Sequence, residues 1–343
     1  MLDASPRILI VRLSAIGDCL HALPVVCALR ERMPKAFLTW VVEGRSGDLL
    51  REHSALDELV IVPRGWLKSP RLVWQLRRKL RQLRFDVAID VQGLTKSGIA
   101  AWLSGAPTRI GMKGVDGREF STLFNNVLIE PASKHVVDRN LELLRPLGIT
   151  APAVKFDIPR SALDDSRADQ IVRTAELTSG FVMINPGAGW PSKLWPTERF
   201  AAVARCLAHD HGLPSLVVWA GAKERAMAES IAAASEGHAL MAPPTTLTEL
   251  ASLIRRARLF VSSDTGPLHL AAAVGTPCVA LFGPMPAERN GPYGMGHVAV
   301  QKIAPNATRH GRRKAGPESM LAITVEDVAR ACQGVLGRRA KAA

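Results

Sequence analysis

Residues 7–24, RILIVRLSAIGDCLHALP, decide the fold of this chain. The apolar run at 7–12 has the length of one buried strand, and a helical pattern begins near residue 19. Continuous apolar strands followed by helices are typical of a parallel sheet that is covered on both faces. Asp18 follows Gly17 at the junction, where it can cap the helix or face a ligand. We expect the glycine to let the loop bend.

The same alternation runs through the first half of the chain. The predicted strands are 7–12, 37–42, 58–62, 86–91 and 108–111. The helix-like stretches between them lie near 19–33, 46–52, 70–84 and 94–104. This order predicts a doubly wound α/β domain.

The pattern restarts after a less regular stretch at about 145–178. The predicted strands are 181–186, 215–221, 238–241, 258–264 and 278–283. The predicted helices lie near 197–210, 223–235, 246–256 and 266–274, and a last one opens at Thr324. We expect two domains, 1–165 and 166–325, then a terminal helix and basic tail at 326–343. Ligands of such sheets bind at the carboxyl ends of the strands, which predicts a cleft between the two domains.

Composition narrows the class of protein. The 343 residues carry a formal net charge of +13, which predicts an anionic partner: nucleic acid, a phospholipid surface or a phosphorylated substrate. Five scattered cysteines without a CxxC pair argue against a disulfide framework and against a zinc site. The start lacks a signal-peptide core, and no uninterrupted apolar stretch is long enough to span a membrane. We expect a cytoplasmic protein.

The stretch SSDTGPLHLAAAVG, residues 262–275, predicts an anion site. Asp264 ends a strand, and Thr265 and Gly266 open a helix whose free N–H groups suit a phosphate. Ordinary helix capping is the alternative. An aspartic protease is disfavoured, because an alanine-rich helix follows the Asp-Thr-Gly. His269 lies one helical turn further on, where it can point to the same site or serve the structure alone.

The stretch NPGAGWPSKLWP, residues 185–196, predicts a second phosphate contact. Gly187 and Gly189 loosen the backbone, and Lys193 brings a positive charge just before a helix. The stretch is neither a P-loop nor a GxGxxG dinucleotide motif, which disfavours kinases and dehydrogenases.

Residues 71–85, RLVWQLRRKLRQLRF, allow two interpretations. The helix can pack its apolar face on the sheet and leave the basic face in water, or that basic face can attract anionic lipid headgroups. Nucleic acid is disfavoured, because no aromatic-rich strand or helix-turn-helix accompanies the charge.

Seven segments in order give the chain a resemblance. They are ILIVRLSAIGDCLHALP, WVVEG, FDVAIDVQGLTKSGIAAWLSGAPTRIGM, HVVDRNLELL, INPGAGWPSKLWPTERFA, WAGAKERA and SSDTGPLHLAAAVGTPCVALFGP. They resemble the bacterial ADP-heptose:lipopolysaccharide heptosyltransferases, inverting glycosyltransferases of family 9. The resemblance covers nearly the whole chain. It implies a GT-B fold, with two Rossmann-like domains that face each other across a cleft.

The resemblance also implies roles for individual residues. Asp18 matches the catalytic base, and ADP-heptose is the implied donor. The donor-binding residues are Lys193 at the diphosphate, Asp264, Thr265, Gly266 and His269 at phosphate and sugar, Glu224 at the ribose, and Gly189 in the loop before Lys193. Arg118 and Glu119 look like a pair that contacts the acidic inner-core sugar in the heptosyltransferase I branch.

The acceptor is implied to be Kdo-lipid A or a heptosylated core, bound by the basic first domain. The candidate cations are Arg64, Lys68, Lys96, Lys113 and Arg118, and plain surface charge is the alternative for each. GAGWPS departs from the Thr pair of the first-heptose branch, whereas WVVEG and DVQGL resemble that branch, so either acceptor stays open.

The mechanism we expect is direct displacement with inversion at the anomeric carbon. Asp18 takes the acceptor proton, and Lys193 and the helix start at Thr265 stabilise the departing ADP without a metal ion. We expect the enzyme at the inner face of the cytoplasmic membrane, with its anionic surface as a partner and no nucleic acid. Three alternatives stay open: another sugar acceptor, a non-catalytic nucleotide-sugar binder and a nucleic-acid-binding protein.

Overall fold

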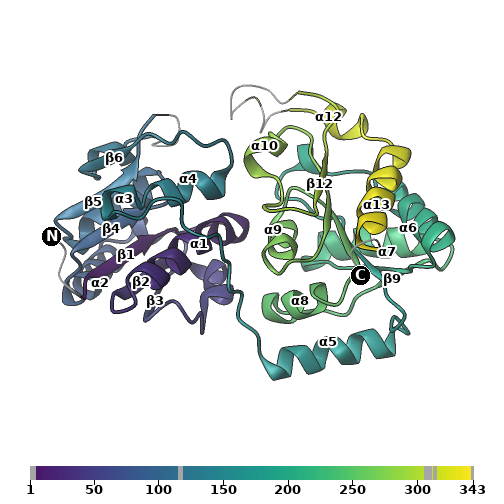
Figure 1. The fold of residues 1–343 in the computed structure, drawn as a ribbon, viewed down its shortest axis with the longest axis horizontal. Coiled ribbons are helices and arrows are strands. Elements are labelled where there is room, and N and C mark those ends of the chain that lie inside the picture. Colours follow the sequence, from purple (N-terminus) through teal and green to yellow (C-terminus); the bar gives the residue numbers. More distant parts are fainter. Residues whose placement is uncertain (1–4, 115–118, 305–310, 312–314, 341–343) are drawn as a thin grey trace. The chain divides into compact units, whose positions relative to one another are not determined.

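The computed structural model describes residues 5–114, 119–304, 311 and 315–340. The chain divides into two compact units, residues 1–159 and 160–343. Each unit is built on one six-stranded parallel sheet with helices on both faces (Figure 1).

The first sheet has the strand order β3-β2-β1-β4-β5-β6. Its strands are β1 (Arg7–Val11), β2 (Phe37–Glu43), β3 (Glu58–Val62), β4 (Val87–Asp90), β5 (Thr108–Met112) and β6 (Val127–Ile129). The order runs one way from β1 and the other way from β4, so the chain winds outward on both sides of this pair. In such sheets, the carboxyl ends of the two central strands are where ligands bind.

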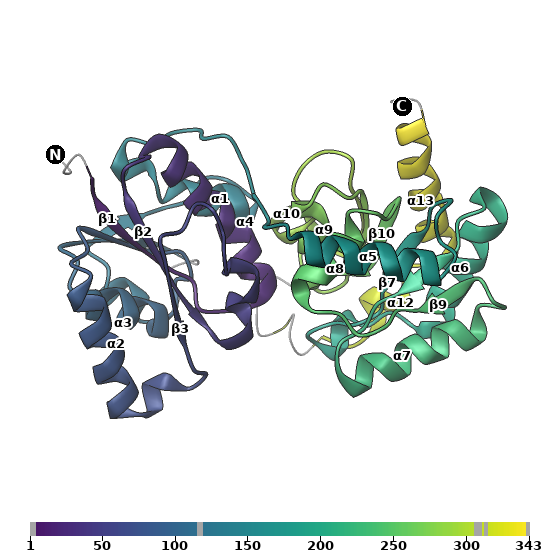
Figure 2. The ribbon, with the colours of Figure 1, turned by 90° about the horizontal axis from the view of Figure 1, so that it is seen from below.

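Helices cover both faces of the first sheet. They are α1 (Ile16–Arg32), α2 (Pro70–Gln82), α3 (Thr95–Ser104) and α4 (Val136–Glu142), with 3-10 turns η1 (Gly44–Leu50), η2 (Trp66–Lys68), η3 (Ser121–Leu123) and η4 (Arg145–Leu147). Figure 2 shows α2 beside α3 on one face and α1 beside α4 on the other. Leu76 and Leu80 of α2 are buried in the core that also holds Leu9 and Val11 of β1.

The second sheet repeats the winding of the first, with the order β12-β11-β10-β7-β8-β9. Its strands are β7 (Val182–Asn185), β8 (Ser215–Val217), β9 (Ala239–Met241), β10 (Leu259–Ser263), β11 (Cys278–Leu281) and β12 (Val298–Val300). Here the order reverses between β7 and β10, which places the loops after these two strands at the expected binding edge.

The helices of the second unit cover its sheet on both faces. They are α5 (Ala162–Thr174), α6 (Thr197–His211), α7 (Gly221–Ala234), α8 (Leu247–Ile254), α9 (Gly266–Ala273), α10 (Ala287–Asn290), α12 (Glu318–Leu321) and α13 (Val325–Ala340), with the 3-10 turn η5 (Pro191–Lys193). The pair α5 and α8 pack together, as do α6 and α13. None of the helices in the described part of the chain has the length and apolar composition to cross a bilayer.

The predicted fold class, two Rossmann-like doubly wound α/β units, is confirmed. The helix predicted at 46–52 is a 3-10 turn, and the stretch at 145–178, predicted to be irregular, contains α5. Helix α5 was not predicted because its sequence has no continuous apolar face. In the structure only Ala168 and Ile171 of this helix are buried. The predicted cleft depends on how the two units are placed relative to each other, so it stays a prediction.

The structure divides the chain between Pro159 and Arg160, whereas the boundary predicted at 165/166 falls inside α5. Arg256, which follows α8, donates hydrogen bonds to Asp165 and Asp169 of α5. These bonds attach α5 to the second unit. The terminal helix α13 also belongs to that unit, where it packs on α6.

The buried thiols give a first prediction. Cys19, Cys27, Cys278 and Cys332 are buried, whereas Cys206 is half-buried on α6. Burial raises the pKa of Cys19 and of Cys332 to about 12 and raises that of the other two buried thiols as well. Because the thiolate is the form that reacts with alkylating reagents, native protein should alkylate at Cys206 first.

Peptide mass spectrometry after brief iodoacetamide treatment at about pH 8 measures each site. The same treatment in guanidinium chloride should label all five cysteines and serves as the control. Labelling of Cys19 in native protein as fast as that of Cys206 would contradict the burial of the helix that carries Asp18.

Candidate active site

Asp18 lies in the first turn of α1, at the carboxyl edge of the first sheet. Its Oδ1 pairs with the guanidinium of Arg12 at 2.8 Å, and its Oδ2 accepts a hydrogen bond from the backbone N–H of Ala15 at 3.2 Å. The Asp18 side chain is nevertheless 42% exposed. The carboxylate is therefore held in one orientation while part of it stays open to solvent.

Arg12 holds this carboxylate from inside the unit. It directly follows β1, is buried, and also donates a hydrogen bond to the carbonyl oxygen of Val91 at 2.7 Å, just after β4. Nearby, the side-chain oxygen of Gln92 accepts the backbone N–H of Leu13 at 2.8 Å. The segments that follow the two central strands are thus bonded to each other. Arg12 was not predicted as a site residue, although a charged residue at the end of a fully apolar strand is a usable signal.

A second ion pair lies at the same edge. The ammonium of Lys96, in the first turn of α3, is 2.8 Å from Oε2 of Glu43 at the end of β2 and 3.2 Å from the hydroxyl of Ser14. The structure therefore brings Lys96 to the loop that precedes Asp18, with its charge paired to Glu43. Sequence reasoning did not identify Glu43.

Other predicted acceptor residues are placed along this edge. Oε2 of Glu119 accepts hydrogen bonds from the backbone N–H and the hydroxyl of Thr95, at the start of α3. Arg64 and Lys68 are exposed in the segment after β3, and Lys113 is exposed directly after β5. All of them follow the carboxyl ends of parallel strands. Arg118 lies outside the described residues.

Three predicted donor-site residues form one buried network in the second unit. The Lys193 ammonium is 2.6 Å from Oδ2 of Asp264, and Nε2 of His269 is 3.1 Å from Oδ1 of the same carboxylate. Burial by itself would raise the pKa of Asp264, but the hydrogen bond with His269 and the charge of Lys193 outweigh it and lower that pKa. The ammonium also lies 4.6 Å from the centre of the Trp190 ring.

The start of α9 lies beside this network. The Thr265 hydroxyl caps the helix by accepting the backbone N–H of Leu268 at 3.4 Å, and Gly266 is the first helical residue. From β7, the side-chain amide of Asn185 donates to the Thr265 hydroxyl at 3.2 Å. The first N–H groups of a helix attract anions, so this end of α9 can contribute to a phosphate site together with Lys193.

Glu224 lies in the first turn of α7 and accepts the backbone N–H of Ala220 at 2.8 Å. Burial raises the pKa of this carboxyl. A Cβ atom added to Gly187 would lie 2.3 Å from the carboxyl carbon of Glu224, so a larger residue there would require the Glu224 carboxyl group to shift. Around Gly189 a Cβ atom would meet nothing within 4 Å. Close packing thus explains Gly187 and not Gly189.

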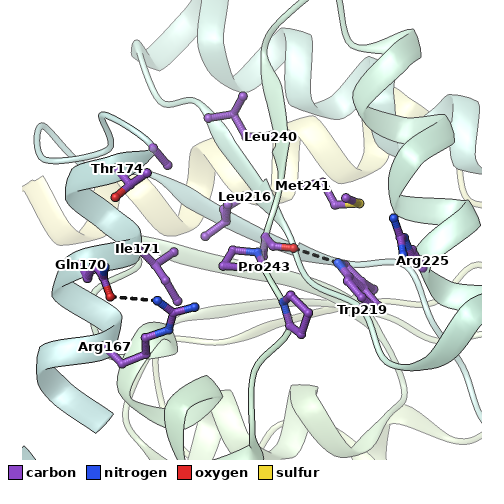
Figure 3. Close-up of a pocket in the computed structure, with 13 residues that line it drawn as sticks. Arg167, Gln170, Ile171, Thr174, Leu216, Trp219, Arg225, Leu240, Met241 and Pro243 are labelled. Carbon is purple, nitrogen blue, oxygen red and sulfur yellow. Dashed lines mark hydrogen bonds between the residues drawn. The ribbon is translucent and has the colours of Figure 1, made fainter. Parts of the chain in front are cut away.

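A pocket of about 650 Å³ lies elsewhere in the second unit, between α5, β8 and the segment that follows β9 (Figure 3). The indole N–H of Trp219 donates to the carbonyl oxygen of Ala242 at 2.8 Å in its wall. None of the predicted site residues lines this pocket. Within the described residues, no three His, Cys, Asp or Glu side chains are grouped so that they could hold a metal ion.

A family model described as glycosyltransferase family 9 (heptosyltransferase) matches residues 73–317. The chain belongs to glycosyltransferase family 9. It is therefore a transferase enzyme, as predicted. The matched range contains Lys193, Glu224 and the network around Asp264, whereas Asp18 precedes it.

Relatives and solved structures extend the likeness to most of this family 9 chain. Lipopolysaccharide heptosyltransferase 1 of Pseudomonas aeruginosa is 29% identical over 316 residues, which cover 88% of this chain and 85% of that protein. The structure of Escherichia coli heptosyltransferase WaaC with ADP is 25% identical, with a TM-score of 0.77, and covers 96% of this chain and 99% of that one. The same enzyme with ADP-2-deoxy-2-fluoro heptose gives a TM-score of 0.73 at 25% identity and the same coverage.

The buried network predicts how stability responds to substitution. Asp264→Asn should lower the free energy of unfolding by about 3 kcal/mol near neutral pH, because it leaves the Lys193 charge without its carboxylate. Because the pKa of Asp264 is lowered in the folded protein, the carboxylate stabilises the fold above the ordinary aspartate value of 3.8. That contribution is lost as the pH falls through the lowered pKa, so the wild type and Asp264→Asn should converge in acid.

Urea unfolding of four full-length proteins measures this coupling: wild type, Asp264→Asn, Lys193→Met and the double variant. The double variant should lose less than the sum of the single losses, by about 1–3 kcal/mol. The exposed pair Arg225 and Glu229 in the same unit is the control, where neutralisation should cost below about 1 kcal/mol. Additive losses at Lys193 and Asp264 would contradict the network.

Proposed function

We propose that this family 9 enzyme transfers a heptose from ADP-heptose to the inner core of lipopolysaccharide, with inversion and with Asp18 as the general base. The acceptor sugar would be Kdo or the first heptose. The names of the relatives and the ADP-heptose analogue in the E. coli structure support the donor and the class of acceptor. One observation carries the catalytic assignment: Asp18 is a held but accessible carboxylate at the binding edge of the first sheet.

Asp18 would remove the proton from the acceptor hydroxyl as that oxygen attacks the anomeric carbon. The oxygen–carbon bond forms on the face opposite the departing ADP while the carbon–phosphate oxygen bond breaks, which inverts the anomeric centre. The proton ends on the Asp18 carboxylate. Arg12 would act as a positioning residue, because it holds Oδ1 of Asp18 while 42% of the Asp18 side chain stays exposed.

The second unit would hold the donor and stabilise the departing diphosphate. Negative charge that develops on the leaving phosphate would be met by the Lys193 ammonium and by the first N–H groups of α9. Asp264 fixes the ammonium in place, and Glu224 would accept hydrogen bonds from the ribose hydroxyls. Because these groups supply positive charge at the diphosphate, we propose that transfer needs no metal ion.

Acceptor binding would fall to the basic edge of the first unit. An inner-core acceptor carries carboxylate and phosphate groups, which suit the exposed cations Arg64, Lys68 and Lys113. The lipid anchor of such an acceptor would place the enzyme at the inner face of the cytoplasmic membrane. A non-catalytic nucleotide-sugar binder is the alternative. In such a protein Asp18 would only cap α1 through the backbone N–H of Ala15, and its 42% exposed side chain would have no catalytic role.

Release of ADP from ADP-heptose, with Kdo-lipid A or a heptosylated core as acceptor, tests the proposal. Asp18→Asn should lower kcat by about 100- to 10,000-fold, the range of one general base. Asp48→Asn is a matched control, because Asp48 also pairs with an arginine and is 40% exposed. No ADP release above the acceptor-free level with either acceptor would reject the transferase proposal. An active Asp18→Asn protein would reject the base.

Arg12 gives a separate prediction. Arg12→Lys keeps the positive charge but cannot bond both Asp18 and the Val91 carbonyl in the arginine geometry. We expect kcat to fall about tenfold or more, since a small misplacement of a catalytic group is costly, while the KM for ADP-heptose stays unchanged. Steady-state kinetics measure both constants. A raised KM for the donor with unchanged kcat would show that Arg12 does not position the base.

A further inference from the structure

The basic charge of this chain is concentrated in one segment of the first unit. Residues 59–85 contain eight arginines and lysines and no aspartate or glutamate, against a net charge of +13 for the whole chain. This segment comprises most of β3, the connection through η2, and α2. Among the described residues, Lys79 pairs with Glu58 at 2.9 Å, and the other seven cations have no carboxylate within ion-pair distance.

Helix α2 separates apolar from basic side chains. Leu76 and Leu80 are buried against the sheet, whereas Arg71, Arg77 and Arg78 are exposed. Charged side chains on the solvent face of a helix are ordinary. If that face carried only charged residues, contact with water would explain it.

Apolar side chains lie among these cations, which a purely solvated face does not require. Trp74 on α2 is 58% exposed, and Leu67, just before the helix, is 38% exposed. The guanidinium of Arg78 lies 5.5 Å from the centre of the Trp74 ring. Residues 71, 74 and 78 follow the i, i+3, i+7 spacing of one helix face.

We propose that this face of α2, with Leu67 before it, is a docking surface for an anionic phospholipid bilayer. Arginines attract the negative headgroups, and tryptophan favours the boundary between headgroups and acyl chains, where its ring is apolar and its N–H stays wet. Charge complementarity favours lipid phosphate as the partner. Nucleic acid would also complement the positive charge. The exposed apolar side chains of Trp74 and Leu67, however, suit the boundary between headgroups and acyl chains better than they suit a nucleic-acid duplex.

The position of the surface agrees with the proposed function. Helix α2 begins after β3, so its first turn lies toward the carboxyl edge of the first sheet, where Asp18 is also placed. Figure 2 shows α2 and α3 together on one face of this sheet. A bilayer bound at the first turn of α2 would bring a lipid-anchored acceptor to that edge. This link to the acceptor rests on the proposed function, whereas lipid binding itself does not.

Co-sedimentation with vesicles tests the surface without any acceptor present. The full-length protein should bind vesicles of phosphatidylethanolamine and phosphatidylglycerol and should bind phosphatidylcholine vesicles much more weakly. The triple variant Arg71→Gln, Arg77→Gln, Arg78→Gln should lose about 100-fold in affinity, about fivefold per basic residue removed. The triple variant Arg173→Gln, Arg330→Gln, Arg338→Gln removes the same charge from exposed sites in the second unit and should keep wild-type binding.

Tryptophan fluorescence tests whether Trp74 contacts the acyl chains. Brominated acyl chains should quench tryptophan fluorescence in the wild type, and Trp74→Phe should remove most of that quenching while the protein still sediments. Equal vesicle binding by the two triple variants, or no binding by the wild type, would overturn the proposal. Tighter binding of duplex DNA than of vesicles through the same three arginines would overturn it in favour of a nucleic-acid surface.

The two proposals fail separately. ADP release with a soluble acceptor fragment, without vesicles, should be the same for the α2 triple variant and the wild type, because these arginines lie outside the proposed catalytic and binding residues. An enzyme active in that assay that does not bind vesicles would reject the lipid surface and keep the transferase. A protein that binds vesicles but releases no ADP would do the reverse.

Discussion

The reversal of strand order in each sheet is the constraint on which the candidate site depends. In the first unit the connections from β1 and β4 run to opposite sides, and in the second unit those from β7 and β10 do the same. The segments that follow these four strands are therefore left at the binding edge rather than covered by a neighbouring crossover. Asp18 and Lys96 lie there in the first unit, as do Lys193 and Asp264 in the second.

The carboxylates of Asp18 and Asp264 form similar ion pairs but differ in burial. Both carboxylates are bonded on both oxygens, but the Asp18 side chain is 42% exposed, whereas the Asp264 side chain is 8% exposed. An exposed carboxylate can exchange a proton with a ligand. A buried carboxylate between a lysine and a histidine instead fixes the position of those two cationic or polar groups. Burial, and not residue type, is what differs between the two carboxylates.

Local patterns predicted much of this architecture. Strand β3 lies at its predicted bounds, because its apolar run ends at a proline, and α2 begins at its predicted residue, because Ser69 and Pro70 mark a helix start. The structure brings Lys193, Asp264 and His269 together, in line with the resemblance, whereas their role at a donor stays a prediction. Contacts across the fold were not predictable: the Gly187–Glu224 approach spans 37 residues, and the bond from Arg12 to the Val91 carbonyl spans 79. No spacing rule connects such positions before the sheet is assembled.

The bonds from Arg256 to Asp165 and Asp169 bear on how this chain could be recombined. Because they fasten α5 to the second unit, a natural joint for exchange lies at Pro159 and Arg160, ahead of that helix. A hybrid joined after α5 would separate both aspartates from their arginine. A hybrid joined before it would carry each sheet with its own helices, ion pairs and edge residues. A gene fusion among family 9 enzymes should therefore keep both units intact when α5 is inherited together with the second unit.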